Sequence, residues 1–422
     1  MLYNEMSRDE LISLKKELEK EYEEVKSLGL SLDMSRGKPG ADQLDLSVDM
    51  LNVMVDAKDC KAENGFDCRN YGVLDGIPEC KKLFAELLDV DTKNVIIGGS
   101  SSLNLMYDYL NQCMYLGVAG CEPWSKQGKV KFICNVPGYD RHFAITEFFG
   151  IEMISVEMDE FGPNVDKIAE LVTDPMVKGM FCVPKYSNPN GVTYSDERVK
   201  ALAALKPAAK DFRVIWDNAY IIHELTDTPD KLINIFDACK EFGTEDYFVE
   251  FTSTSKISFP GAGVSAIAAS DNNVAEIKKR LNFQTISYDK LNQLRHVKYF
   301  KNLDGIKAHM DKHAVILVPK FQLVLDKLEK EIQPLGVGKW VKAKGGYFIS
   351  YDTVGSSAKR IGELCKNAGL VLTTVGATYP YGVDPEDKNI RIAPTFPSVE
   401  DLSKALDVFC LCVKIAAIEA LI

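Results

Sequence analysis

The stretch from Lys129 to Phe251 constrains the fold more than any other part of the chain. Short apolar runs alternate there with polar segments of helical pattern, and the runs read VKFICNV, GIEMISV, KGMFCV, FRVIW and DYFVEF. Apolar strands that alternate with helices are typical of α/β units on a mostly parallel sheet. We therefore predict an α/β fold with a three-layer α/β/α large domain, in which ligands bind beyond the carboxyl ends of the strands.

Polar and aromatic residues directly follow several of these runs. The segments are Pro137-Gly138-Tyr139, the YSNPNG stretch from Tyr186 to Gly191, and Asp217-Asn218-Ala219-Tyr220. Each has a structural explanation by itself, as a turn tyrosine, an Asn-Pro turn and an aspartate that caps the next helix. Because the carboxyl ends of parallel strands share one edge of the sheet, the segments together predict a binding site there.

A single lysine, Lys256, follows the last apolar run at the same predicted edge. It lies in TSTSKISFPGAG (residues 252–263), between small hydroxyl residues and a Pro-Gly turn. A desolvated lysine has a lowered pKa, and its neutral amine can attack an aldehyde such as that of pyridoxal phosphate. A lone lysine is far more often a surface charge, so the rest of the chain must support this interpretation.

A second cluster of small polar residues follows the apolar run Val95-Ile96-Ile97. The sequence GGSSSL (residues 98–103) joins that run to a predicted helix. Backbone N–H groups, hydroxyls and the helix dipole then point at one spot, which favours anion binding. Serine at the start of a helix is also common for purely structural reasons.

Composition excludes several classes of function. A chain of 422 residues with net charge -11 and no basic stripe is not a nucleic-acid binder, and its length predicts two domains. Eleven cysteines without CxxC pairs and five histidines predict no metal site, and the cysteines are expected to be buried thiols in a reducing compartment. The N-terminus has no signal-peptide pattern, and the longest apolar run (408–422) is too short and too charged to span a membrane. We expect a cytoplasmic protein.

The two ends of the chain predict a different kind of structure. Ser7-Arg8-Asp9-Glu10 has the pattern of a capping box before an amphipathic helix. After Lys256, a long helical stretch to about Leu335 precedes strand-like GGYFISY, helical KRIGELCKNAG and strand-like NIRIA, and Ser398 could cap a last helix. This order of elements indicates an α+β region.

Taken together, these motifs resemble the class I aminotransferases of the fold-type I pyridoxal-phosphate family. The residues that carry the resemblance are Asp217-x-x-Tyr220, Ser253-x-Ser255-Lys256 with Pro260-Gly261, SNPNG (187–191), Tyr71 with Gly76, Gly37, and Asn389 to Ile392. RGKP, GGSSSL and SKISFPGAG are similar to the MocR-like subgroup, which contains aspartate aminotransferases of the Ic type. The resemblance spans nearly the whole chain. It implies the PLP-dependent transferase fold, with a large PLP-binding domain over 46–305 and a small α+β domain from 1–45 and 306–422.

The resemblance assigns a catalytic role to several side chains. Lys256 would bind the cofactor covalently and then carry the proton between the substrate Cα and the cofactor. Asp217 would hold the pyridine nitrogen protonated, and Tyr220 and Asn188 would hydrogen-bond the ring oxygen. Tyr139 would stack on the ring.

The resemblance also assigns binding roles. The phosphate would be held by Gly99, Ser100, Ser101, Ser253 and Ser255. Tyr71 would reach it from the neighbouring subunit of a homodimer. Gly37, Asn188 and Arg391 would bind the substrate, because the planar guanidinium of arginine suits a carboxylate.

The chain departs from the family pattern after Pro260. Members of the family usually carry a phosphate-binding arginine in this segment, whereas Gly261-Ala262-Gly263-Val264 contains no cation. Hydroxyls, the helix dipole or a basic residue from elsewhere must compensate. A distal substrate carboxylate would need a further cation, for which Arg36, Lys38, Lys290 and Arg295 are equal candidates.

The implied function is a PLP-dependent aminotransferase that moves the amino group of L-aspartate or L-glutamate to a 2-oxo acid such as 2-oxoglutarate. One alternative is another reaction at Cα or Cβ on the same cofactor, by a β-lyase or a decarboxylase. A second is a MocR-type regulator, which the sequence disfavours because the aminotransferase-like body begins within about thirty residues of Met1. A third is a binding protein that kept the fold, against which both Lys256 and Asp217 argue.

Overall fold

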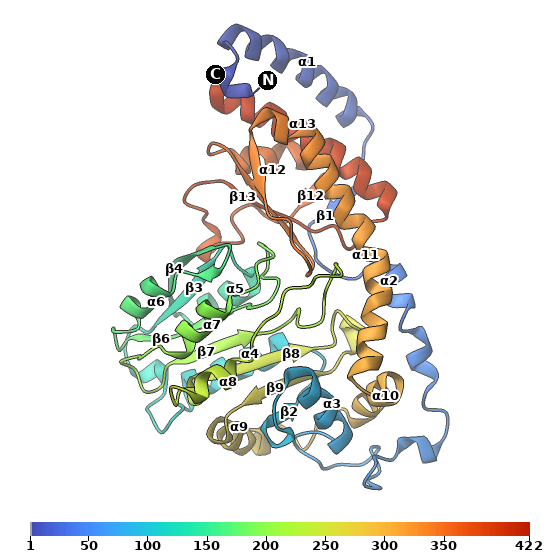
Figure 1. Ribbon diagram of the computed structural model, residues 1–422, viewed down its shortest axis with the longest axis vertical. Helices are drawn as coiled ribbons and strands as arrows, with labels where there is room; N and C mark the ends of the chain where they lie inside the picture. Colours follow the sequence, from blue (N-terminus) through green and yellow to red (C-terminus); the bar gives the residue numbers. More distant parts are fainter. Residues whose placement is uncertain (1) are drawn as a thin grey trace.

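An eight-stranded sheet forms the centre of the computed structural model, which describes residues 2–422 (Figure 1). The strands lie in the order β2-β9-β8-β7-β6-β3-β4-β5. Their bounds are β2 Val95–Ile97, β3 Lys131–Val136, β4 Glu152–Asp159, β5 Gly162–Pro163, β6 Val177–Cys182, β7 Arg213–Asp217, β8 Phe248–Ser253 and β9 Ser265–Ala269. The pairs from β4 through β3, β6 and β7 to β8 are parallel, whereas β9 is antiparallel to both of its neighbours. The predicted mostly parallel sheet is confirmed.

Helices cover both faces of this sheet. They are α3 Pro78–Leu88, α4 Ser102–Tyr115, α5 Asp140–Phe148, α6 Val165–Leu171, α7 Asp196–Ala203, α8 Ile235–Lys240, α9 Asp271–Gln284 and α10 Lys290–Phe300. Trp216 of β7 packs in one core with α6, α7 and α8, whereas its neighbour Ile215 packs in another with α4 and α9. Successive residues of a strand point to opposite faces, so these two cores establish the three layers.

A second set of elements lies beyond the carboxyl ends of the strands and contains both chain ends (Figure 1). Strands β10 Gly338–Trp340, β11 Ile349–Thr353 and β13 Asn389–Ile392 form an antiparallel sheet, and β1 Leu32–Met34 pairs in parallel with β12 Leu370–Leu372. The helices here are α1 Arg8–Ser27, α2 Ala41–Asp45, α11 Leu303–Glu331, α12 Ala358–Asn367 and α13 Val399–Leu421.

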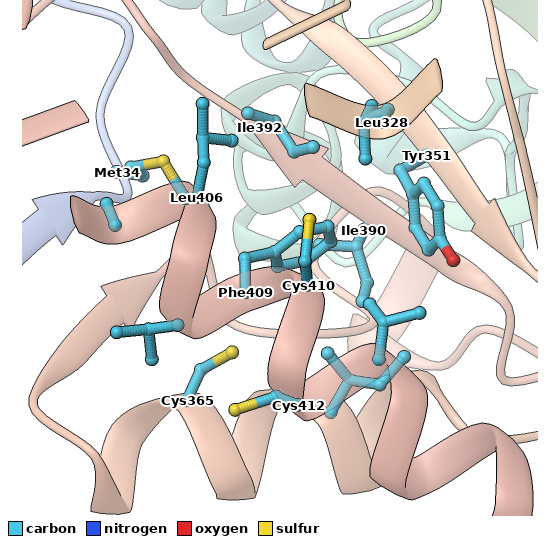
Figure 2. Packing of buried hydrophobic residues seen from close by; sticks show 14 of the residues in the cluster. Met34, Leu328, Tyr351, Cys365, Ile390, Ile392, Leu406, Phe409, Cys410 and Cys412 are labelled. Atoms are coloured by element: carbon cyan, nitrogen blue, oxygen red, sulfur yellow. The ribbon is translucent and has the colours of Figure 1, made fainter. Parts of the chain in front are cut away.

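Helix α13 is the centre of the core in this part. Leu406, Phe409 and Cys412 of α13 are fully buried, and side chains from α11, α12, β1, β11 and β13 surround them (Figure 2). Helix α1 packs along α13, which brings the two ends of the chain together (Figure 1).

The predicted helix starts at both ends of the chain are confirmed. The Ser7 hydroxyl accepts a hydrogen bond from the backbone of Glu10 at 3.4 Å, and the Glu10 carboxylate accepts one from the backbone of Ser7 at 2.8 Å. Ser398 caps α13 by accepting from the backbone of Asp401 at 3.1 Å. These hydrogen bonds satisfy N–H groups that have no partner inside the helix.

The predicted helical stretch after Lys256 is interrupted. Helix α10 ends at Phe300, Lys301 has a φ of 68°, and Asn302 begins α11 by accepting a hydrogen bond from the backbone of Gly305 at 2.9 Å. Helix α11 then extends past both parts of the molecule. Ile306 packs in the core under α3 and α10, whereas Leu328 packs in the core of α13.

All eleven cysteines are free, and most of them are buried, as the sequence predicts. Within residues 2–422, no helix has the length and apolar character needed to cross a membrane. In the same residues, no group of three or more His, Cys, Asp or Glu side chains is placed to hold a metal ion.

Candidate active site

A cavity of about 650 Å³ lies at the carboxyl ends of the parallel strands. It is lined by predicted site residues from well-separated segments, namely Gly37, Ser101, Tyr139, Asn188, Asp217, Tyr220, Ser253, Ser255, Lys256 and Arg391. The α/β topology is the reason, because the loops after β3, β6, β7 and β8 emerge at one edge of the sheet.

Lys256 lies in the turn that follows β8 and is half-buried. Its Nζ is 5.0 Å from the ring centre of Tyr220 and 5.8 Å from that of Tyr347. Burial lowers the pKa of the Lys256 amine, the negative charge of Asp217 opposes this shift, and the positive charge of Arg391 adds to it. The net effect favours the neutral, nucleophilic amine.

Asp217 ends β7 and is 2% exposed. Its Oδ2 is 2.9 Å from Nε2 of His142, whereas its Oδ1 is buried without a hydrogen-bond partner. A buried carboxylate oxygen without a partner is destabilising, so a bound N–H group at this position would be strongly favoured. The structural explanation of Asp217 as a helix cap is wrong, because turns follow it and the next helix, α8, begins at Ile235.

His142 was missed in the sequence. It lies in the first turn of α5, and its ring stacks on Phe181 with centroids 4.1 Å apart. The signal was its position three residues after Tyr139, since residues three apart share one face of a helix. The two rings meet edge to face at 4.9 Å.

Hydroxyl groups from two segments meet at the start of α4. Ser101 caps the helix by accepting from the backbone of Leu103 at 3.2 Å. Ser255 donates to the carbonyl oxygen of Ser100 at 3.2 Å, and Ser253 donates to the Ser255 hydroxyl at 3.0 Å. The Ser100 carbonyl belongs to this cluster, whereas the Gly99 carbonyl accepts from the hydroxyl of Ser265, and neither residue lines the cavity. The helix start and the hydroxyls form a suitable site for an anion.

The Pro-Gly segment after Lys256 forms a short 3-10 turn, Pro260–Ala262. A Cβ atom added at Gly263 would lie 3.1 Å from the carbonyl oxygen of Ser100 and 3.2 Å from the hydroxyl of Thr254. The segment is therefore tight at Gly263, whereas a Cβ atom at Gly261 would have no other atom within 4 Å.

Arg391 of β13 faces the cavity from the opposite wall and is 7% exposed. Its Nη1 donates to Asp140 at 2.8 Å and to the side-chain oxygen of Asn188 at 3.2 Å. Its guanidinium lies 4.8 Å from the ring centre of Phe348. A Cβ atom at Gly37 would be 2.2 Å from that same ring, so only glycine permits the close approach of the N-terminal loop.

The two tyrosines of the cavity are held as neutral phenols. Burial raises the pKa of Tyr139 to about 12 and the pKa of Tyr220 well above its ordinary value. Both can therefore act as hydrogen-bond donors over the working pH range. Tyr71 does not line the cavity, and 77% of its surface is exposed.

The structure separates the candidate cations for a distal carboxylate. Arg36 and Lys38 line the cavity, together with Arg141, which was missed in the sequence. Lys290 instead donates to Ser287 at 2.6 Å, and Arg295 donates to Asn292; neither lines the cavity.

A mostly parallel sheet with a desolvated lysine and a buried carboxylate at its strand ends is the arrangement of a fold-type I aminotransferase, as the resemblance implied. The family model described as "Aspartate amino-transferase" matches residues 6–422. The chain therefore belongs to the aspartate aminotransferase family.

Relatives of this chain extend over its whole length. An aspartate aminotransferase from Corynebacterium glutamicum is 46% identical over 404 residues, which is 96% of this chain and 93% of the relative. A Mycolicibacterium smegmatis protein, provisionally named an aminotransferase, is 44% identical over 425 residues, with 100% of this chain and 99% of the relative covered. The crystal structure of an aspartate transaminase from C. glutamicum has a TM-score of 0.96 at 44% identity and covers 99% of both chains. The predicted fold class and the aminotransferase class are confirmed.

Proposed function

We propose that this aminotransferase uses pyridoxal phosphate to move the amino group of L-aspartate or L-glutamate to a 2-oxo acid such as 2-oxoglutarate. The observation that carries the proposal is the unpartnered, buried Oδ1 of Asp217 in the same cavity as the desolvated Lys256. Few groups other than a protonated ring nitrogen would satisfy this oxygen so close to a reactive amine.

The residues of the cavity fit this cofactor at each of its polar groups. The Lys256 amine suits the aldehyde, Asp217 suits the pyridine nitrogen, and the phenol of Tyr220 with Asn188 suits the ring oxygen. When bound, pyridoxal phosphate supplies an electron sink for the bond that breaks at the substrate Cα. Lys256 then holds and moves the proton at Cα, and Tyr139 limits the tilt of the ring.

The phosphate group is assigned to the start of α4 and the surrounding hydroxyls, with Gly99, Ser100, Ser101, Ser253 and Ser255. The helix dipole and the hydroxyl donors replace the missing arginine. We further propose a homodimer in which Tyr71 reaches the phosphate of the neighbouring site, and its 77% exposure supports this role. From the family resemblance we also propose a large domain over 46–305 and a small domain over 1–45 and 306–422. The same resemblance supports the proposal that the chain belongs to the MocR-like subgroup.

The charge of the cavity supports a dicarboxylic substrate. Arg391, with Asn188 and the close approach at Gly37, is assigned to the α-carboxylate. Arg36 and Arg141 form no ion pair within residues 2–422, although both line the cavity. Unpaired guanidinium groups beside a binding cavity suit a second carboxylate, which a monocarboxylic amino acid lacks.

The alternative reactions at Cα or Cβ share these residues, and family membership favours amino transfer over them. The test is the absorbance change of the purified protein with pyridoxal phosphate when a panel of L-amino acids is added, followed by recovery with 2-oxoglutarate. We expect complete cycles with aspartate and glutamate. A faster reaction with alanine or an aromatic amino acid would overturn the substrate, and release of ammonia or carbon dioxide would overturn the reaction.

The role of the two free arginines is tested by Arg36→Gln and Arg141→Gln. Loss of one charge-assisted hydrogen bond costs about 1.5–3 kcal/mol, so kcat/KM for aspartate should fall roughly tenfold to a hundredfold in at least one variant. The value for alanine should stay within about twofold. Arg8→Gln, on the exposed start of α1, is the control, and equal losses for aspartate and alanine would refute the assignment.

A further inference from the structure

All five histidines of the chain are buried, although the reaction proposed above uses none of them directly. His142 contacts Asp217, and the other four do not line the cavity. Three of those four, His296, His309 and His313, hydrogen-bond the segment Thr254 to Ser258, which carries Lys256 and is named here the lysine turn. The hydrogen bonds from three buried histidines to this one turn need a physical explanation.

The carbonyl groups of the lysine turn are held from outside the cavity. The Ile257 carbonyl oxygen lies 3.0 Å from Nε2 of His309 and 3.0 Å from Nε2 of His313. The neighbouring carbonyl oxygen, that of Lys256, accepts from the hydroxyl of Tyr347 at 3.4 Å. Two successive peptide planes are thus oriented by side chains from α11 and from the segment before β11.

Hydrogen-bond chemistry assigns the tautomer of His313. The side-chain oxygen of Gln43 accepts from the backbone of Gly40 at 3.2 Å, which fixes the direction of its amide. The Gln43 amide nitrogen therefore donates to Nδ1 of His313 at 3.1 Å and to the Tyr347 hydroxyl at 3.0 Å. Because Nδ1 accepts, the proton of the neutral ring is on Nε2, which lies 3.0 Å from the carbonyl oxygen of Ile257 and 3.2 Å from Nε2 of His309.

His296 holds the far end of the turn in the same neutral state. Its Nδ1 lies 2.8 Å from the carbonyl oxygen of Asn292, which can only accept, so this nitrogen carries the proton. Its Nε2 lies 2.8 Å from the hydroxyl of Ser258 and accepts from it. Burial lowers the pKa of both His296 and His313 to about 4.

Neither a metal site nor simple packing accounts for the His309 and His313 pair. Histidines four residues apart on a helix can share a metal ion, but within residues 2–422 no third His, Cys, Asp or Glu completes a site. Packing alone would not require the amide of Gln43, 270 residues away in the sequence, to fix which nitrogen faces the turn.

We propose that His313, oriented by Gln43, is a positioning residue for Lys256, and that it fixes the Ile257 carbonyl group of the lysine turn from outside the cavity. The inference rests on the proposed role of Lys256. An amine that must alternate between the cofactor and the substrate Cα needs a backbone that does not follow its motion, because misplacement by about 1 Å can cost roughly a hundredfold in rate.

The test compares His313→Leu, His313→Gln and, as a matched control, Met310→Ala, each in the full chain loaded with pyridoxal phosphate. Met310 lies one turn earlier on α11, is buried and packs in the same core as Ile257 without a hydrogen bond to the turn, so it tests the packing of the turn alone. We expect His313→Leu to slow single-turnover amino transfer at least about tenfold. We also expect it to shift the pH midpoint of the absorbance band of the lysine-bound cofactor. His313→Gln keeps an N–H donor and should restore both.

Several outcomes would overturn the proposal. The first is a His313→Leu variant whose single-turnover rate and absorbance midpoint equal those of the wild-type protein. The second is a Met310→Ala variant that is slowed as much as His313→Leu when both have lost the same amount of melting temperature, which would show that His313 has a packing role only. If His313→Leu does not fold, Gln43→Leu and Tyr347→Phe test the same hydrogen bonds, and wild-type behaviour in both refutes the inference. The absorbance midpoint needs no amino acid substrate. A wild-type protein that binds pyridoxal phosphate at Lys256 without transaminating would therefore refute the proposed function and still test the position of Lys256.

Discussion

Asp217 and Glu250 are buried carboxylates on neighbouring strands, and they differ in almost everything except burial. Asp217 is 2% exposed on β7, and Glu250 is 3% exposed on β8. In the register of the parallel pair, Asp217 lies beside Phe251 and Glu250 lies beside Trp216, so the two carboxylates point to opposite faces of the sheet. Asp217 faces the cavity with a histidine against it, whereas Glu250 accepts a hydrogen bond from Asn218 at 2.8 Å.

The difference shows that surroundings, and not burial, decide what a carboxylate can do. Asp217 shares its cavity with the Lys256 amine and with Arg391, whose guanidinium is always positively charged. Glu250 has an amide as its hydrogen-bond partner, and burial raises its pKa to about 7. Asp217 is therefore suited to a role in the chemistry of the cavity, whereas ionisation of Glu250 lowers the stability of the folded protein.

The largest effect expected from this comparison is on turnover in Asp217→Ala. In the proposed function, the substitution removes the anion assigned to the ring nitrogen of pyridoxal phosphate and leaves Lys256 to bind the cofactor. The variant should fold, turn yellow with the cofactor, and transaminate at least about a hundredfold more slowly, which is roughly 2.7 kcal/mol. Single-turnover kinetics beside a melting curve measure both quantities.

Lys256→Ala is the companion variant and should differ in kind, because it removes the proposed covalent link and the proposed proton carrier together. Unchanged turnover in Asp217→Ala would exclude Asp217 from the mechanism and make the two carboxylates functionally equivalent.

Glu250→Gln should change stability and leave turnover unaltered. A folded-state pKa near 7, raised from the ordinary 4.5, means that the folded protein binds the extra proton between these values, so stability falls as the pH rises through this window. Glutamine keeps the oxygen that Asn218 contacts and cannot ionise. At pH 8 the variant should be more stable by about 1–2 kcal/mol, below the ceiling of roughly 3 kcal/mol that the pKa difference sets.

Denaturant unfolding at pH 8 and at pH 4.5 measures this effect, since the difference should nearly vanish at the lower pH. An equal difference at both pH values would show that Glu250 is ionised throughout, as a salt-bridged carboxylate would be. A fall in turnover would instead link it to the cavity.

His142→Phe tests how much the histidine beside Asp217 contributes to turnover, and its effect is expected to be the smallest of those on turnover. Phenylalanine keeps the stacking on Phe181 and removes the ring nitrogen that contacts Asp217, so Asp217 would have an apolar neighbour in place of a hydrogen bond. We expect turnover to fall about tenfold, near the low end for a hydrogen bond to a charged group. His142→Asn can restore a donor, and turnover that is equally low in both variants would indicate a packing role.

Much of the site could be predicted because its residues follow apolar runs whose length and alternation specify parallel strands. Tyr139, Asn188, Asp217 and Lys256 share one cavity for that topological reason. His142 could not be found this way, since a lone histidine in a helix is equally well explained as a core residue. Its spacing of three residues from Tyr139 indicates only a shared helix face, and its contact with Asp217 depends on the distance from α5 to the end of β7, which no local pattern encodes.

The same limit applies to contacts between distant segments. Gln43 and His313 are separated by 270 residues, and only the packing of α2 against α11 brings them together. Glu250 lies within the run DYFVEF, where the apolar neighbours predict a buried strand but not which face the acid would take. The break at Lys301 had a local signal in Asn302, a favoured capping residue that the surrounding helical pattern concealed.

Helix α11 connects the core under α3 and α10 to the core around α13. Its 29 residues span roughly 44 Å, with the lysine turn against its first half and the core beneath the Arg391 strand against its second. A rotation of one core relative to the other would bend this helix. The bend is expected at Pro319, which has no backbone N–H to donate within the helix. The distance between Lys256 and Arg391 therefore depends on the straightness of this helix as well as on the bonds from Arg391 to Asp140 and Asn188.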